Sequence, residues 1–295
     1  MTLIELITAQ SARLKQAGVS FGHGTTNAFD ESAWLVSWAL GLPLDALEAR
    51  AQTPLSAADQ AKAEALVAQR IESRRPAAYL THEAWLQNVP FYVDERVIVP
   101  RSFIAELLVD GEAEGTLDAW LSDTTRAVLD LCTGNGSLAV IAAMAYPEIV
   151  VEAADISDDA LAVARINVDK HGLGQRITLV KSDLLASVAG PFDLILCNPP
   201  YVTTHSMAAL PPEYQAEPSL ALAGGDDGMD LVRSIVRDAP AHLTAQGVLV
   251  LEIGNERRHF EHAFRRLEVA WLETSAGADQ VLLATRDALT RWSAK

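Results

Sequence analysis

Cysteine is scarce in this chain of 295 residues, which contains only two, Cys132 and Cys197. Two cysteines are too few for the disulfide framework that stabilises small secreted domains. Their separation also matches none of the short spacings that are typical of zinc or iron–sulfur ligands. The sequence therefore excludes a disulfide scaffold, and we expect no bound metal.

Positive charge is also in short supply, because 23 Lys and Arg residues face 39 Asp and Glu residues, which gives a net charge of −16. A protein that binds DNA or RNA without a partner needs a basic surface to neutralise the phosphates. We therefore expect no stable binding of nucleic acid, and a basic protein is the better candidate for a partner.

Long apolar segments are absent as well. The run from Leu138 to Tyr146 has nine residues, about half of the roughly 20 that a membrane-spanning helix needs. The start of the chain lacks the positively charged region of a signal peptide and contains Glu5. We expect no membrane segment, and a cytoplasmic location.

The length suggests two units of unequal size, and the first of them has apolar residues at helical spacing. Asp30 is predicted to cap a helix that ends at Gly41, and Ser56 to open a helix that runs to about Arg74. We predict a helical domain over residues 1–78 that recognises the substrate.

Residues 79–100 carry short strand-like pieces in place of helical periodicity. These pieces are Tyr79-Leu80, Trp85-Leu86 and 91–93, with a turn expected at Asn88 and Pro90. We predict a β-hairpin that links the two larger units.

The remainder of the chain, residues 101–295, alternates strands with helices, which predicts an α/β fold with a mostly parallel sheet and helices on both faces. In such sheets a ligand binds beyond the carboxyl ends of the strands. The expected strands are 127–131, 149–154, 177–181, 192–197 and 247–253, and the expected helices are 137–146, 158–171 and 230–243.

A glycine loop follows the first of these strands and runs from Asp130 to Gly136. Glycines allow the backbone to approach a ligand closely, and the next helix offers free N–H groups. The pattern from Gly134 to Ala139 is by itself a weak match to a dinucleotide-binding loop, and a tight turn without a ligand fits it too.

Acidic residues follow the second and third strands. Asp155 lies roughly 20 residues after the glycine loop, where a carboxylate can accept hydrogen bonds from a ribose diol. Asp183 is placed to accept from an exocyclic amino group such as that of adenine. Either aspartate fits the alternative role of a helix cap.

The fourth strand leads directly into Asn198-Pro199-Pro200-Tyr201. Two prolines fix φ at consecutive residues and remove two N–H donors, which leaves carbonyl groups on a rigid turn. The Asn198 side-chain oxygen and the Pro199 carbonyl can each accept one hydrogen of a planar amino group, and Tyr201 can stack on that group. The turn thus predicts catalysis by orientation, against the alternative of an Asn-Pro turn that only ends a strand.

These motifs resemble those of class I S-adenosylmethionine-dependent amino-methyltransferases, and over nearly the whole chain those of the HemK-type protein glutamine methyltransferases. The stretches that carry the resemblance are Phe21–Thr25, Val97–Ser102, Asn198–Val202 and Glu217–Gly228. They are most similar to the PrmB-like branch, which methylates a glutamine of a large-subunit ribosomal protein. The sister branch acts on peptide-chain release factors and usually has Pro-Arg-Pro-Asp-Thr-Glu where this chain reads Pro-Arg-Ser-Phe-Ile-Ala-Glu.

The resemblance implies S-adenosyl-L-methionine as cofactor and assigns roles to individual residues. The chain departs from the pattern of this branch at Phe103, where proline is common. Cys132 stands where the wider superfamily frequently has a glycine. The implied sets are Asp130, Cys132, Thr133, Gly134, Asn135, Gly136, Asp155, Ile156, Asp183, Leu184 and Asn198 for the cofactor; Asn198, Pro199, Pro200 and Tyr201 for catalysis; and Arg101, Phe103 and Tyr201 for the substrate.

Other functions fit part of the pattern. An NAD-dependent dehydrogenase would use the glycine loop and Asp155 but leaves Asn198–Tyr201 without a role. A nucleic-acid amino-methyltransferase shares the core motifs but normally carries a basic recognition domain. A non-catalytic binding module would not need the intact Asn198–Tyr201 turn.

Two charged clusters complete the sequence-based predictions. Glu256, His259 and His262 look like a solvated helix face and not like metal ligands. Acidic residues after the Asn198 turn have no Lys or Arg among them, which predicts a docking surface for a basic ribosomal protein; they are Glu213, Glu217, Asp226, Asp227 and Asp230.

Overall fold

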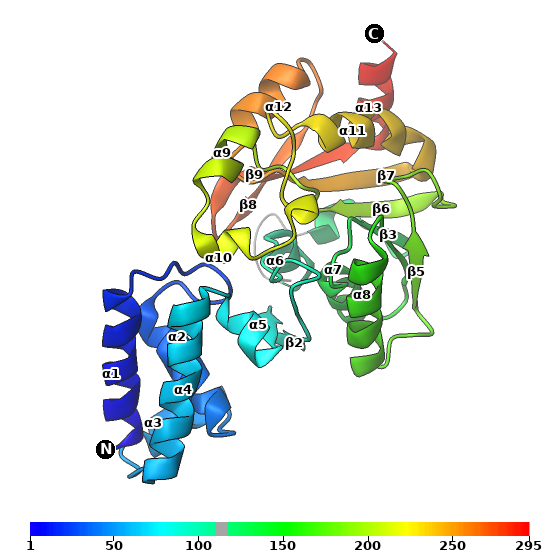
Figure 1. Ribbon diagram of the computed structural model, residues 1–295. Helices are drawn as coiled ribbons and strands as arrows, with labels where there is room; N and C mark the ends of the chain where they lie inside the picture. Colours follow the sequence, from blue (N-terminus) through cyan, green and yellow to red (C-terminus); the bar gives the residue numbers. More distant parts are fainter. Residues whose placement is uncertain (110–116, 295) are drawn as a thin grey trace.

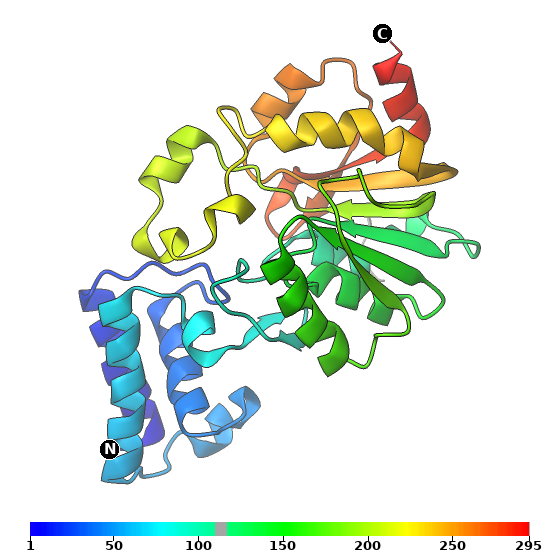
Figure 2. The same cartoon turned by 45° about the vertical axis from the view of Figure 1, so that its right-hand side comes forward.

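A computed structural model describes residues 1–109 and 117–294 of the chain. Figures 1 and 2 show a group of helices at the N-terminal end beside a twisted sheet that is covered by helices on both faces. A two-stranded hairpin lies where these two parts meet.

The N-terminal part is built on α1 (Leu3–Gln16), α2 (Ala28–Ala39) and α4 (Ala57–Ser73). The shorter elements η1 (Leu44–Ala46), α3 (Leu47–Arg50) and α5 (Ala77–Thr81) complete it. The prediction that Asp30 caps the second helix is wrong, because the Asn27 side chain accepts from the backbone N–H groups of Phe29 and Asp30. Ser56 caps α4 as predicted.

The hairpin is shorter than the sequence indicates. Tyr79-Leu80 belongs to helix α5, so the prediction of a strand there is wrong; Pro76 is the N-cap of this helix, and Tyr79 packs into an apolar cluster with Trp34 and Val99. The two strands are β1 (Ala84–Leu86) and β2 (Val89–Phe91). Gln87 and Asn88 both have positive φ, as the tight hairpin turn requires.

The main sheet has seven strands in the order β5-β4-β3-β6-β7-β9-β8. Strands β3 to β7 are parallel, as predicted, and β9 runs antiparallel to both of its neighbours. Their bounds are β3 Ala127–Leu131, β4 Val150–Asp155, β5 Ile177–Lys181, β6 Phe192–Cys197, β7 Leu243–Glu252, β8 Ala270–Thr274 and β9 Gly277–Thr285. The sequence did not indicate β8 and β9, because the first half of β9 is polar and exposed.

Each face of the sheet has its own apolar core. The first core includes side chains of α6 (Ile104–Val109) and α7 (Ser137–Ala145), and the second includes those of α11 (Asp230–His242). Figure 1 shows α11, α12 and α13 on one side of the sheet and α6, α7 and α8 on the other. The remaining elements are α8 Asp158–Lys170, α9 Thr204–Ala209, α10 Pro212–Gln215, α12 Arg257–Ala263, α13 Arg286–Ser293, η2 Leu117–Trp120 and η3 Ser219–Ala221.

The strand order reverses between β3 and β6, which are neighbours in space but not in sequence. This reversal is the topological switch point, where open α/β sheets bind their ligands beyond the carboxyl ends of the strands. The fold therefore places the glycine loop after β3 next to the Asn198 turn after β6.

The N-terminal helices share an apolar core with the rest of the molecule. Trp34 and Tyr79 pack in one cluster with Val99 and with Val163 of α8. Within residues 1–109 and 117–294, no helix is both long and apolar enough to cross a membrane.

Candidate active site

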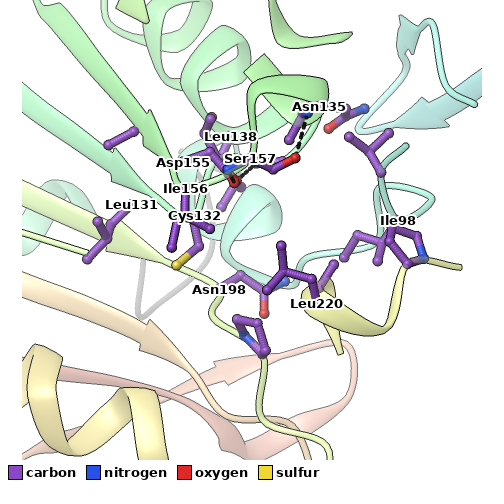
Figure 3. Close-up of a pocket in the computed structure, with 18 of the residues that line it drawn as sticks. Ile98, Leu131, Cys132, Asn135, Leu138, Asp155, Ile156, Ser157, Asn198 and Leu220 are labelled. Carbon is purple, nitrogen blue, oxygen red and sulfur yellow. Dashed lines mark hydrogen bonds between the residues drawn. The ribbon is translucent and has the colours of Figure 1, made fainter. Parts of the chain in front are cut away.

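A cavity opens at the switch point, and its walls come from segments that lie far apart in the sequence (Figure 3). Figure 3 shows Asn135 and Asp155 on one side of it, and Asn198 and Leu220 on the other. The predicted site residues that line it are Arg101, Cys132, Thr133, Gly134, Asn135, Asp155, Ile156, Asp183, Leu184, Asn198 and Pro200. Further lining residues come from 96–102 and 218–221.

The glycine loop needs its glycines for two different reasons. A Cβ on Gly134 would have no described atom within 4 Å, so this residue leaves open space in the loop. A Cβ on Gly136 would lie 3.2 Å from the Cβ of Ala164, so this residue allows α8 to pack closely against the loop. Both have positive φ, and so does Cys132.

Asp130 supports the loop from inside and is not among the residues that line the cavity. It is 1% exposed, and one carboxylate oxygen accepts from the Thr133 hydroxyl at 2.5 Å and the Ala139 N–H at 3.0 Å. Burial raises the pKa of Asp130 to about 7. Gly136 is also absent from the cavity wall, so these two residues shape the loop without facing a ligand.

Asp155 connects the second strand to the glycine loop. Its carboxylate accepts from the N–H of Gly134 at 2.9 Å and from the N–H of Ser157 at 2.9 Å. Burial raises the pKa of Asp155. Asp183 lies exposed at the cavity edge, and Leu184 beside it has a positive φ of 47°.

The Asn198 turn forms the opposite wall. Asn198 and Pro200 line the cavity, whereas Pro199 is buried behind them. The chain after the turn is held by backbone hydrogen bonds from Val202 N–H to Leu222 carbonyl and from Gly224 N–H to Val202 carbonyl. These two bonds anchor the chain directly after the turn.

Tyr201 and Phe103 are not among the described residues that line the cavity. The Tyr201 hydroxyl donates to Glu252 at 3.4 Å, and its ring packs on Gly254, where a Cβ would lie 2.5 Å from the ring. Phe103 packs against the apolar core on the α6 side of the sheet. Contact of these two side chains with a substrate stays a prediction.

Sequence reasoning missed the role of Glu252 at the end of β7. This carboxylate is 2% exposed and accepts from the Ser102 hydroxyl at 2.6 Å and the Phe103 N–H at 2.9 Å. Burial raises the pKa of Glu252 to about 7. Because Tyr201 donates to the same side chain, Glu252 ties the Asn198 turn to the segment that precedes α6.

The prediction of an acidic docking surface is wrong for Glu213 and Glu217, which are buried, whereas Asp226 and Asp230 are exposed and Asp227 is partly exposed. Glu213 is completely buried and pairs with Arg70 and Arg74, while Glu217 is 4% exposed and pairs with Arg101. Asp227 and Asp230 both pair with Arg233. The basic partners lie elsewhere in the sequence, so the acidic run is largely neutralised. The sequence also concentrates acidic residues between positions 81 and 125, and those between 110 and 116 lie outside the described residues.

The cysteines and histidines take no part in a metal cluster among residues 1–109 and 117–294. Cys197 is fully buried, and burial together with the nearby Cys132 thiol raises its pKa. His259 is exposed and pairs with Glu256 on α12, as expected for a solvated helix face.

The strand order, the glycine loop and the Asn198 turn together define a class I methyltransferase. A family model described as "Methyltransferase small domain" matches residues 109–210, and one described as "PrmC N-terminal domain" matches residues 5–81. A solved structure of the hMettl16 catalytic domain in complex with MAT2A 3'UTR hairpin 6 superposes with a TM-score of 0.51. It is 14% identical and covers 77% of this chain and 81% of that chain, so it supports the fold alone.

The chain belongs to the family of ribosomal protein uL3 glutamine methyltransferases. The Bordetella pertussis member is 50% identical over 98% of this chain and 96% of its own length. The Burkholderia pseudomallei member is 50% identical over 96% of this chain and 94% of its own length. The resemblance noted in the sequence is thereby confirmed.

Proposed function

We propose that this protein transfers a methyl group from S-adenosyl-L-methionine to the side-chain amide nitrogen of a glutamine in ribosomal protein uL3. The observation that carries this proposal is the rigid Asn198-Pro199-Pro200 turn on one wall of a cavity whose other wall is the glycine loop and Asp155. Relatives named for this activity cover nearly the whole chain.

The glycine-loop wall fits the cofactor. Gly134 leaves room beside the loop, and the buried Nδ2 of Asn135 has no hydrogen-bond partner among the described residues. Asp155 offers carboxylate oxygens to a ribose, and Asp183 lies where it can accept from adenine. When bound, the cofactor supplies an electrophilic methyl group on a sulfonium.

The Asn198 wall fits a primary amide. Asn198 Oδ1 on the cavity wall accepts one amide hydrogen. Pro199 is not among the described residues of that wall, so acceptance of the second hydrogen by its carbonyl stays a prediction. With both hydrogens held, the nitrogen lone pair is directed away from the wall and toward the cofactor. Because an amide nitrogen is a weak nucleophile, this orientation and the polarising effect of two acceptors supply the catalysis. No general base has to take a proton before transfer: the new carbon–nitrogen bond would form as the methyl–sulfur bond breaks, leaving a neutral thioether, and the methylated nitrogen would then release one proton to solvent.

The other assigned residues support this geometry. Tyr201 and Glu252 hold the turn in place, and Arg101 forms the wall next to Asn198. We infer that the helical part, residues 1–78, recognises the protein substrate, with 79–100 as linker and 101–295 as the methyltransferase domain. With Glu213 and Glu217 buried, the proposal of a basic partner rests on the overall charge of −16 and on Asp226, Asp227 and Asp230 at the surface.

The test is methyl transfer from radiolabelled cofactor to three purified acceptors: uL3, a peptide-chain release factor and ribosomal RNA. We expect label in uL3 and at most trace label in the other two. Preferential labelling of the release factor would assign the chain's activity to the sister branch, and labelling of RNA would refute glutamine as the target.

A further inference from the structure

Two of the stretches that carry the family resemblance, Phe21–Thr25 and Glu217–Gly228, contact each other in the folded protein. His23, in the connector between α1 and α2, lies with its Nε2 3.6 Å from an Oε2 of Glu217, which follows α10. The His23 ring also packs on the Tyr214 ring, with 4.2 Å between centroids. A Cβ on Gly22 would lie 2.2 Å from the Tyr214 hydroxyl, so only glycine fits this contact.

Glu217 is the centre of this contact. Its carboxylate is 4% exposed and accepts from the N–H of Val99 at 2.9 Å. It also accepts two hydrogen bonds from Arg101, from Nη1 at 2.6 Å and from Nη2 at 2.7 Å. A bidentate pair of this kind fixes the plane of the guanidinium as well as its position.

Arg101 in turn lies on the cavity wall with Asn198, and its guanidinium is 5.6 Å from the centre of the Tyr214 ring. A lone guanidinium at this place would repel a sulfonium cation, because both carry a positive charge. Pairing with Glu217 makes the local net charge zero. Arg101 is therefore held between Tyr214 and Glu217, and His23 of the helical part lies beside Glu217 without a hydrogen bond to it among the described residues.

We propose that Glu217 is a positioning residue that fixes Arg101 in the cavity wall and cancels its charge, so that the cavity accepts a cationic cofactor. This inference rests on the proposed use of S-adenosylmethionine. It predicts discrimination by charge, because the product S-adenosylhomocysteine has the same groups but a neutral sulfur.

The experiment measures the affinities of S-adenosylmethionine and S-adenosylhomocysteine by isothermal titration calorimetry, without any methyl acceptor. In Glu217→Gln, which keeps the size of the side chain, we expect affinity for the cationic ligand to fall roughly fivefold to tenfold more than affinity for the neutral one. The quantity compared is the ratio of the affinity for S-adenosylmethionine to the affinity for S-adenosylhomocysteine. Arg101→Gln leaves the Glu217 carboxylate unpaired and should raise this ratio. The double variant Arg101→Gln/Glu217→Gln restores the wild-type ratio.

A matched control is Glu31→Gln, which breaks another buried ion pair of the helical part, with Arg70, away from the cavity wall. We expect it to leave the ratio unchanged. Three results would overturn the proposal. The first is an equal loss of affinity for both ligands in Glu217→Gln, and the second is a changed affinity ratio in Glu31→Gln. The third is a wild type that binds neither ligand. If Glu217→Gln does not fold, Arg101→Gln still decides by the direction of its shift.

The same preparation distinguishes this inference from the proposed function. If the wild type shows the expected binding but methylates no glutamine of uL3, the proposed function fails and the role of Glu217 stands. If it methylates uL3 and the ratio does not respond to Glu217→Gln, only the role of Glu217 fails.

Discussion

Replacing Arg70 by leucine should destabilise the protein strongly, because this guanidinium is buried at the contact between α4, α2 and the segment around α10. Arg70 is 0% exposed; its Nε donates to Glu31 at 2.9 Å and its Nη1 to Glu213 at 3.3 Å. Its Nη2 donates to the Ser20 carbonyl at 2.9 Å.

The magnitude follows from what the substitution leaves behind. Glu213 keeps Arg74 at 2.7 Å, whereas Glu31 keeps only the Thr25 hydroxyl at 3.2 Å. Burial already raises the pKa of Glu31 in the presence of Arg70. Removing one partner of a buried ion pair costs about 3–5 kcal/mol, so we expect Arg70→Leu to lower the free energy of unfolding by about that much.

The assay is urea denaturation of the wild type, Arg70→Leu and the double variant Arg70→Leu/Glu31→Leu. The double variant should lose less than the single one, because both charges leave the interior together. Arg237→Leu serves as the control, since its pair with Asp238 is exposed, and should change stability far less than Arg70→Leu does. A loss in Arg70→Leu no larger than in Arg237→Leu would refute the reasoning.

Three further predictions concern the site. Because the pKa of Glu252 is raised to about 7 in the folded protein, its carboxyl keeps a proton that the unfolded chain releases above about pH 4.5, so stability falls as pH rises from there to about 7. Urea titrations at several pH values measure this effect. Over this pH interval the free energy of unfolding of the wild type should fall by about 3 kcal/mol relative to that of Glu252→Gln. A difference between the two proteins that does not change with pH would contradict the raised pKa of the buried Glu252 carboxyl. Asp155→Asn should weaken cofactor binding more than about tenfold in calorimetry, with unchanged affinity as the contrary result. Gly134→Ala and Gly136→Ala should each lower the free energy of unfolding by about 1–2 kcal/mol, because both positions have positive φ. Gly136→Ala should cost more than Gly134→Ala because of the contact with Ala164, and only Gly134→Ala should also weaken cofactor binding; the reverse pattern would contradict the placement of the loop.

The parallel part of the sheet could be predicted because its strands are short apolar runs with turn residues at their ends. The glycine loop and the Asn198 turn were found for the same reason: each follows directly after such a strand. Tyr79-Leu80 was predicted as strand because its residue types favour β structure, but Pro76 and tertiary packing place it in a helix.

What the sequence could not show are the pairings between distant residues. Ser102 and Glu252 are 150 positions apart, and Arg101 and Glu217 are 116 apart. No local pattern records such contacts, and for this reason the sequence alone predicts an exposed acidic surface where Glu213 and Glu217 are buried. The burial of these carboxylates follows only from how the helical part packs against the segment after β6.

The measurement that tests the central claim most directly compares the wild type with Asn198→Ala. Both are given S-adenosylmethionine with an isotopically labelled methyl group and purified uL3, and the label is located by tandem mass spectrometry. We predict that the wild type places the label on a glutamine side-chain nitrogen. Asn198→Ala should lose on the order of a hundredfold or more in turnover, a far larger loss than in its affinity for the cofactor. Label on any other group, or undiminished turnover in Asn198→Ala, would contradict the proposal that this turn orients a glutamine amide for methyl transfer.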